Sequence, residues 1–239
     1  MITWGVVGVP TSAAAHWPGL EHTRTAIDAV YAAGQVPLVL GGDCTLAVAL
    51  VSAALEAGHD VGLMYVDGGQ DLMIPTDHPD EPILDAMGVA HLLDLPGTVD
   101  QIAALGPRRP MLEPSRVCFF GYGDEEEDIH GLVPSPRYPA STVARAPLQE
   151  AERALAELTR SNEVLIVHFD VDVLDSFLQP GADIPQYGRG LDLDSVMAAL
   201  EVFVRHPGFR GMTLCEFNPD HGQHDSAQRL VAGLATALG

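Results

Sequence analysis

The sequence has no lysine, so all 12 basic residues of the 239-residue chain are arginines. This excludes lysine Schiff-base chemistry, lysine-anchored pyridoxal phosphate and the phosphate-binding P-loop, because each of these depends on a lysine amine. Cysteine is sparse as well: Cys44, Cys118 and Cys215 lie far apart, and three residues build neither a disulfide framework nor a zinc ribbon. Such sparse cysteines are typical of a reducing compartment, and we expect a cytoplasmic protein.

Long apolar runs and positive charge are also scarce. No apolar run reaches the roughly 18 residues that a membrane span needs, and the N-terminus lacks the pattern of a signal peptide. The 33 acidic residues outnumber the 12 basic ones and give a formal net charge of -21. Nucleic acids and anionic membranes attract clustered cations, so we expect neither as a partner. The acidic surplus favours metal ions, amines or guanidinium groups.

Short apolar segments alternate with segments of helical length along the whole chain. The expected strands are residues 3–9, 36–40, 61–66, 116–121, 164–169 and 211–216. The expected helices are residues 21–33, 45–57, 98–105, 148–160, 192–205 and 226–238, with a long surface loop at 130–147. This alternation predicts one α/β domain over residues 1–239, built on a mainly parallel sheet.

Acidic residues follow four of the expected strands at the point where each strand ends. The four segments are Gly41-Gly42-Asp43-Cys44-Thr45, Asp67-Gly68-Gly69-Gln70-Asp71, Asp170-Val171-Asp172-Val173-Leu174-Asp175 and Cys215-Glu216-Phe217-Asn218-Pro219. The working residues of parallel sheets lie just beyond the carboxyl ends of the strands, so we expect these side chains to meet.

The spacing within the third segment predicts where its side chains point. If the strand continues, Asp170 and Asp172 project to one side of the sheet, and His168 points the same way one pair of residues deeper. Several carboxylates in one partly dry place raise each other's pKa and destabilise the fold unless a cation or protons neutralise them. The alternative is that these aspartates cap helices and turns.

The four segments, in this order, resemble the motifs of the arginase–agmatinase (ureohydrolase) superfamily. They are similar to Gly-Gly-Asp-His-Ser, Asp-Ala-His-x-Asp, Asp-x-Asp-x-x-Asp and Glu-x-Asn-Pro, and the resemblance extends from Gly5 to the C-terminal helix. It implies a three-layer α/β/α sandwich that assembles into trimers or hexamers. It also implies two Mn²⁺ ions that activate water for attack on a guanidinium or amidine carbon.

The resemblance implies a set of metal ligands that departs from the family pattern. The implied ligands are Cys44, Asp67, Asp71, Asp170 and Asp172. Cys44 replaces a histidine, and a thiolate favours Zn or Fe over Mn; the alternative is that this cysteine packs as an apolar side chain. Gly69 replaces a second histidine, so the sequence leaves open whether the protein binds one metal ion, two or none. The histidines considered as replacements are His78, His91, His168 and His221, each with an ordinary structural role as its alternative.

The resemblance also assigns residues to the substrate. Glu216 matches the acid that pairs with the guanidinium group, and Glu126 lies in the loop that holds the substrate's amino group. Met87 replaces a proton-shuttling histidine, which leaves Asp71 as the nearest proton carrier, and Met73 replaces a substrate-binding asparagine. Arginine itself is therefore not the expected substrate.

Two functions remain open from the sequence. The first is a hydrolase that breaks a C–N bond of a guanidino- or amidine-type small molecule in specialised metabolism, with Asp71 and Glu216 as catalytic residues. The second is a pseudoenzyme or repurposed fold without metal, which binds a cationic ligand, catalyses a metal-free reaction or serves a partner subunit. The retained acids argue against complete decay of the site and favour a bound cation, and the hydrolase is the function that we expect first.

Overall fold

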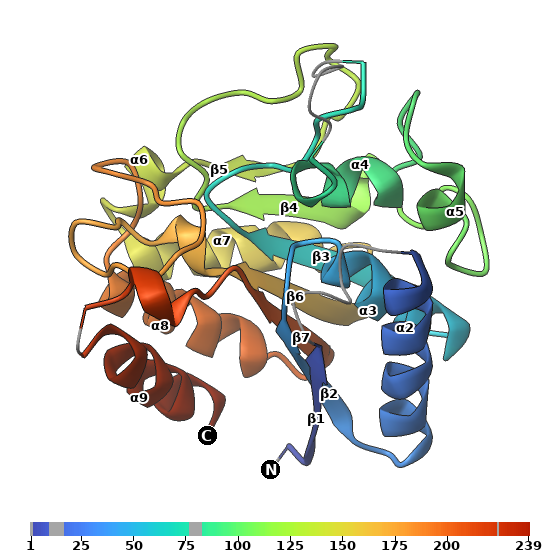
Figure 1. Cartoon of the computed structure of the whole chain (residues 1–239), viewed down its shortest axis with the longest axis horizontal. Coiled ribbons are helices and arrows are strands. Elements are labelled where there is room, and N and C mark those ends of the chain that lie inside the picture. The colour runs from blue at the N-terminus through green and yellow to red at the C-terminus, as the bar shows by residue number, and fades with distance from the viewer. Residues whose placement is uncertain (1, 10–16, 77–82, 224) are drawn as a thin grey trace.

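The computed structural model describes residues 2–9, 17–76, 83–223 and 225–239. Within them, seven strands form one sheet in the order β1-β2-β7-β6-β3-β4-β5, and every pairing is parallel (Figure 1). The strands are β1 (Trp4–Val9), β2 (Val36–Gly41), β3 (Val61–Val66), β4 (Val117–Phe120), β5 (Arg137–Tyr138), β6 (Val164–Asp170) and β7 (Phe209–Cys215). The expected parallel sheet is confirmed.

Helices cover both faces of this sheet. They are α2 (Trp17–Ala32), α3 (Leu46–Glu56), α4 (Gly88–Leu92), α5 (Asp100–Ala103), α6 (Ala140–Val143), α7 (Pro147–Leu158), α8 (Leu193–Val204) and α9 (Ser226–Leu238). The α2 and α3 helices pack on one face, α7 and α8 pack on the other, and α9 lies beside α8 (Figure 1). The three-layer α/β/α sandwich is therefore confirmed. None of the helices in the described ranges has the length and apolarity to cross a membrane.

The side chains of the central strands alternate between two apolar layers. On β3, Leu63 and Tyr65 pack toward α2 and α3, whereas Met64 and Val66 pack toward α7 and α8. Every residue of β3 and β6 is buried, as expected for strands that are covered on both faces. The sheet core thus holds the strand ends in fixed positions.

Three expected elements differ in the structure. The segment 130–147 is not a loop throughout, because β5 pairs with β4 and the short α6 follows it. Proline is frequent in this segment, and proline is tolerated beside a short edge strand. The helix expected at 98–105 is only α5, since the backbone of Val99 is extended. Helix α2 begins at Trp17, four residues before its expected start.

The strand order brings the four acidic segments together. Strands β2, β7, β6 and β3 are consecutive neighbours in the sheet, so all four segments leave it at the same edge. Val66 pairs with Phe169, which places Asp67 level with Asp170. A register shift at Leu165 and Ile166 precedes these pairs between β6 and β7.

Gly41 ends β2 with a φ of +149°, which side chains rarely adopt, and an added Cβ would lie 2.1 Å from the carbonyl oxygen of Val9. We expect Gly41→Ala to lower the free energy of unfolding by about 2–4 kcal/mol in urea titrations. Gly8→Ala is the control, because an added Cβ there meets nothing within 4 Å. It should change the stability by less than about 1 kcal/mol. Equal effects of the two substitutions would contradict this explanation.

Candidate metal centre

The acidic side chains that follow the strands surround one cavity of about 170 Å³. Its lining includes four of the expected ligands: Asp67, Asp71, Asp170 and Asp172. None of the four is more than 8% exposed. Their strands, β3 and β6, are direct neighbours, which explains why residues a hundred positions apart meet here.

Each of three aspartates uses one carboxylate oxygen to hold a turn. Asp67 Oδ1 accepts a hydrogen bond from the backbone N–H of Gly69 at 2.6 Å, and Asp172 Oδ1 accepts one from Gly68 at 2.8 Å. Asp170 Oδ1 accepts one from the backbone of Asp172 at 2.6 Å. The turns therefore engage only Oδ1 of each carboxylate. Because Oδ2 remains, the same aspartate can both hold a turn and bind a metal ion.

The condition under which Asp170 and Asp172 would project to one side of the sheet, continuation of the strand, is not met. Strand β6 ends at Asp170, and Val171–Val173 form a 3-10 turn that the Asp170 carboxylate caps. This cap bends the chain at the point where strict alternation would continue. Asp172 nevertheless lines the same cavity as Asp170, because the turn redirects its side chain to the cavity wall.

Four side chains that could each donate one atom to a metal ion converge beneath the cavity. The Cys44 thiol, in the turn between β2 and α3, donates to Asp170 Oδ2 at 2.7 Å and lies 3.7 Å from Asp67 Oδ2. His168 Nε2 lies 3.4 Å from Asp67 Oδ2. The donor atoms of Cys44, Asp67, His168 and Asp170 all lie within 4.8 Å of one another, and all four residues are buried. This arrangement is suited to holding a metal ion.

A second, overlapping group consists of Cys44, Asp71 and Asp85. The carboxylate of Asp71 accepts a hydrogen bond from the hydroxyl of Tyr65, and Asp71 has a positive φ of 50°. Asp85 Oδ1 accepts a hydrogen bond from the backbone N–H of Cys44 at 2.7 Å. Sequence reasoning missed Asp85, because its segment was considered only for the histidine replaced by Met87.

Burial and mutual repulsion shift the pKa values of these acids upward. Burial raises the pKa of Asp67 to about 7, and the charges of Asp85 and Glu127 contribute. Burial, with the charge of Asp67, raises the pKa of Asp172 to about 7. The pKa of Asp170 is also raised by burial and by the neighbouring aspartates. Without a cation the cluster therefore holds protons near neutral pH, and a bound cation would displace them.

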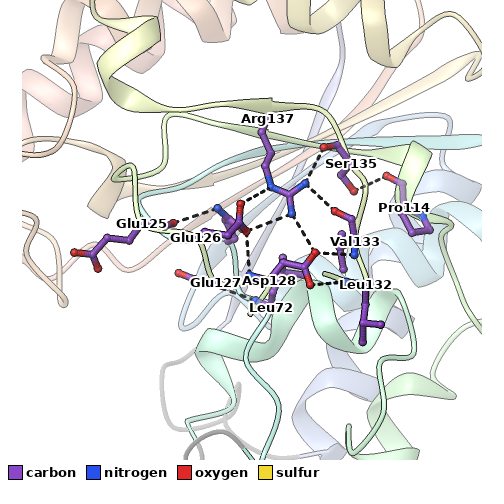
Figure 2. A network of polar contacts seen from close by, with 11 residues as sticks. Leu72, Pro114, Glu125, Glu126, Glu127, Asp128, Leu132, Val133, Ser135 and Arg137 are labelled. Carbon is purple, nitrogen blue, oxygen red and sulfur yellow. Dashed lines mark hydrogen bonds and ion pairs between the residues drawn. The ribbon is translucent and has the colours of Figure 1, made fainter. Parts of the chain in front are cut away.

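The acidic loop after β4 contributes a residue other than the expected one. Figure 2 shows Glu126 turned to Arg137, with its Oε2 3.2 Å from Arg137 Nε. The Glu126 side chain is exposed and does not line the acidic cavity, so its substrate role stays a prediction. Glu127 lines the cavity and accepts a hydrogen bond from the backbone of Leu72 at 3.3 Å (Figure 2).

Glu127 also lies beside Gly69. A Cβ added at Gly69 would meet Glu127 Oε1 at 2.9 Å and Asp67 Oδ1 at 3.5 Å. The Glu127 carboxylate thus lies where a side chain at position 69 would begin. The sequence contained the signal, an acidic run at residues 124–128, but did not show which of its members faces inward.

Glu216 lies at the end of β7, next to the acidic cavity but outside its lining. It lines a larger, mostly apolar groove of about 660 Å³ between β2, β7 and α9. Burial, followed by the charges of Asp85 and Asp183, raises the pKa of Glu216 to about 8. Its pairing with a substrate cation stays a prediction.

The other replaced or candidate residues have packing roles where the structure describes them. Met87 is buried beside Ile74 and Ala90. His91 is buried with both ring nitrogens hydrogen-bonded, to the carbonyl of Met87 and the backbone N–H of Val99. Exposed His221 contacts the Ala182 carbonyl. His78 lies outside the described residues, so His168 is the candidate histidine found at the cluster.

The Arginase family model matches residues 4–239, and the chain belongs to the arginase family. It is 27% identical over 219 residues to an arginase from Staphylococcus aureus, covering 86% of this chain and 68% of that protein. It is 28% identical over 224 residues to an arginase from Eremothecium gossypii, covering 86% of this chain and 53% of that protein. Membership of the superfamily whose motifs the sequence resembles is thereby confirmed, although the chain spans only about half of the second relative.

Solved structures show the same fold. An arginase from Bacillus caldovelox superposes with a TM-score of 0.82 at 22% identity, covering 93% of this chain and 75% of that one. A formimidoylglutamase from Bacillus subtilis superposes with a TM-score of 0.76 at 17% identity, covering 92% of this chain and 66% of that one. These likenesses support the fold and leave the substrate open.

The raised pKa values predict how the stability of the metal-free protein depends on pH. Asp67 and Asp172 have pKa values of about 7 in the fold, against about 3.9 for an unfolded aspartate. Between these values the folded state binds more protons, so stability falls as the pH rises. With a chelator, we expect a melting temperature several degrees lower at pH 8 than at pH 5.5. A divalent metal should restore it at pH 8; a rise in stability from pH 5.5 to 8 without metal would contradict the prediction.

Asp170→Asn should separate metal binding from stability. The substitution removes a buried acid that, without metal, is crowded by Asp67 and Asp172. We expect metal uptake to be lost and the metal-free protein to melt at a higher temperature at pH 8, measured by elemental analysis and calorimetry. Glu152→Gln removes one exposed acid from α7 and should change neither quantity. Full metal uptake by Asp170→Asn would contradict the ligand assignment.

Proposed function

We propose that this arginase-family chain is a metal-dependent hydrolase of a C–N bond in a guanidino- or amidine-type small molecule. The observation that carries the proposal is the buried convergence of Cys44, Asp67, His168 and Asp170 under an acidic cavity. Family membership and the relatives named arginase and formimidoylglutamase support this reaction class. Met73 and Met87, which replace a substrate-binding asparagine and a proton-shuttling histidine of the family pattern, argue against arginine as the substrate.

The residues present fit a divalent metal ion. Carboxylate oxygens, a thiol and an imidazole nitrogen are all metal donors, and His168 Nε2 has no hydrogen-bond partner although it is buried. We propose Cys44, Asp67, Asp71, Asp170 and Asp172 as the residues that hold one or two ions, Zn or Fe in preference to Mn. When bound, such an ion lowers the pKa of a water molecule and makes it a nucleophile at neutral pH.

Asp71 is the residue that we propose to carry the proton. It lines the cavity, and its carboxylate is fixed by the Tyr65 hydroxyl. A carboxylate held beside the attacking water can accept its proton and donate it to the leaving amine. Met87 cannot take this role, because a thioether has no exchangeable proton.

The acidic walls supply the recognition of a cationic substrate. Asp85 and Glu127 line the cavity, and their charges attract a guanidinium or amidinium group. Glu216 and Asp183 line the adjoining groove, where we propose that Glu216 orients the same cation. Glu126 would have to release Arg137 before it could contact a substrate, so Glu127 is the stronger candidate on this loop.

One observation favours the alternative function, a fold repurposed for a metal-free task. The Cys44 thiol donates directly to Asp170, which pairs two of the donors without an ion. A cationic ligand in the acidic cavity would then neutralise the remaining carboxylates. Elemental analysis separates the two functions, because only the hydrolase needs the metal.

The test is metal loading followed by hydrolysis of a substrate panel. We expect one to two equivalents of Zn²⁺ or Fe²⁺ per chain, and release of urea, ammonia or formamide from guanidino or formimidoyl compounds. Asp71→Asn should lower kcat by about 10²–10⁴-fold, the usual contribution of a general acid–base group. Glu152→Gln should match the parent protein. Failure to bind any of Zn²⁺, Fe²⁺ or Mn²⁺ would overturn the proposal and support the metal-free alternative.

A further inference from the structure

We propose that His168 is a metal ligand, which supplies from inside the sheet the imidazole that is missing at Gly69. Together with Cys44, Asp67 and Asp170 it forms a four-donor centre whose chemistry suits Zn²⁺ or Fe²⁺. The inference rests on the proposed function, because it names a ligand for the same metal. His168 lies outside the Asp-x-Asp-x-x-Asp motif, two residues before its first aspartate.

Strand geometry places His168 directly below Asp170. The two residues are separated by one position on β6, so their side chains leave the same face of the sheet. In the register, His168 pairs with Tyr65 on β3 and with Thr213 on β7. All three of these side chains are fully buried. The imidazole thus occupies a fixed place in a cross-strand row beneath the carboxylates.

Both neighbours in this row orient the ring. The His168 ring stacks on Tyr65 with centroids 4.3 Å apart and an angle of 14°. Its Nδ1 lies 2.7 Å from Thr213 Oγ1, within hydrogen-bond distance. With the proton on Nδ1 donated to the threonine hydroxyl, the lone pair of Nε2 is free. Metal-binding histidines commonly donate their other ring N–H in this way, which fixes the tautomer and the ring orientation.

The free nitrogen is the feature that points to a ligand. His168 Nε2 is buried without a hydrogen-bond partner, and Asp67 Oδ2 lies 3.4 Å from it. A buried polar atom without a partner destabilises a fold, and a metal ion would satisfy it. His91 differs, because both of its nitrogens are hydrogen-bonded.

The donor set points to the class of metal. A thiolate and an imidazole beside two carboxylates favour Zn²⁺ or Fe²⁺, whereas Mn²⁺ prefers oxygen-rich sites. The competing explanation is structural: Nε2 carries the proton and forms a weak polar contact with Asp67. Under that explanation His168 stabilises the fold but never contacts the metal.

X-ray absorption at the zinc edge of the zinc-loaded, full-length protein distinguishes these explanations. We expect one sulfur scatterer at about 2.3 Å from zinc, together with the outer-shell scattering of one imidazole ring. His168→Gln should keep the sulfur, lose the imidazole scattering and weaken zinc binding by more than the roughly 10- to 100-fold that loss of a ligand's outer partner costs. His91→Gln removes another buried imidazole and should keep the parent spectrum.

The outcomes separate this inference from the proposed function. Zinc bound through sulfur without imidazole in the parent protein would overturn the role of His168 and leave the metal hydrolase standing. Imidazole scattering that persists in His168→Gln would assign the ligand to another histidine. No uptake of zinc, iron or manganese would overturn both proposals.

If His168→Gln fails to fold, the spectrum of the parent protein and the variant Thr213→Val test the inference instead. Thr213→Val should keep the imidazole scattering and weaken zinc binding, whereas unchanged affinity would contradict the orienting role of Thr213.

Discussion

The crowding of carboxylates in a dry place is the constraint on which the rest of this structure depends. Asp67, Asp71, Asp170 and Asp172 repel one another when ionised, and burial removes the water that would otherwise screen them. Such a cluster persists in a stable fold only when protons or a cation neutralise it. The backbone N–H groups of the strand-end turns offset part of this repulsion, and they aim the remaining oxygens inward.

The sheet supplies the rigidity that this cluster requires. Strands β2, β7, β6 and β3 are adjacent, and helices cover both of their faces, so the strand ends cannot move apart to relieve the charge. Two residues at this edge, Asp71 and Glu216, have positive φ values of 50° and 60°, and among the described non-glycine residues Asp94 and Asp124 share this conformation. Such conformations persist where the surroundings fix them, and they are common at functional sites.

Local patterns of apolar and acidic residues predicted the parallel sheet, its central strands and the acidic edge, whereas the three layers were implied by the family resemblance. The sequence did not indicate strand β5, because its two residues lie in a proline-rich segment and form a strand only by pairing with β4. Inside the site, the four aspartates were predicted from their positions after strands. Glu127 faces the cavity because its carboxylate accepts a hydrogen bond from Leu72, whereas Glu126 pairs with Arg137. Both partners lie outside the acidic run itself. The orientation of His168 depends on Tyr65 and Thr213 on two other strands, which no single segment reveals.

The register shift at the start of β6 and β7 has a consequence at the far end of both strands. Leu165 pairs with Phe209 but Ile166 pairs with Gly211, so Arg210 is an extra residue on β7. If Arg210 instead paired with Ile166, Met212 would be level with His168 in place of Thr213, and its side chain would leave the layer that it now occupies. The number of β7 residues between the bulge at Arg210 and the acidic edge therefore determines which side chain, here Thr213, contacts the His168 ring. A one-residue change of pairing at the amino end of these strands would thus replace the side chain beside His168 without any substitution at the acidic edge.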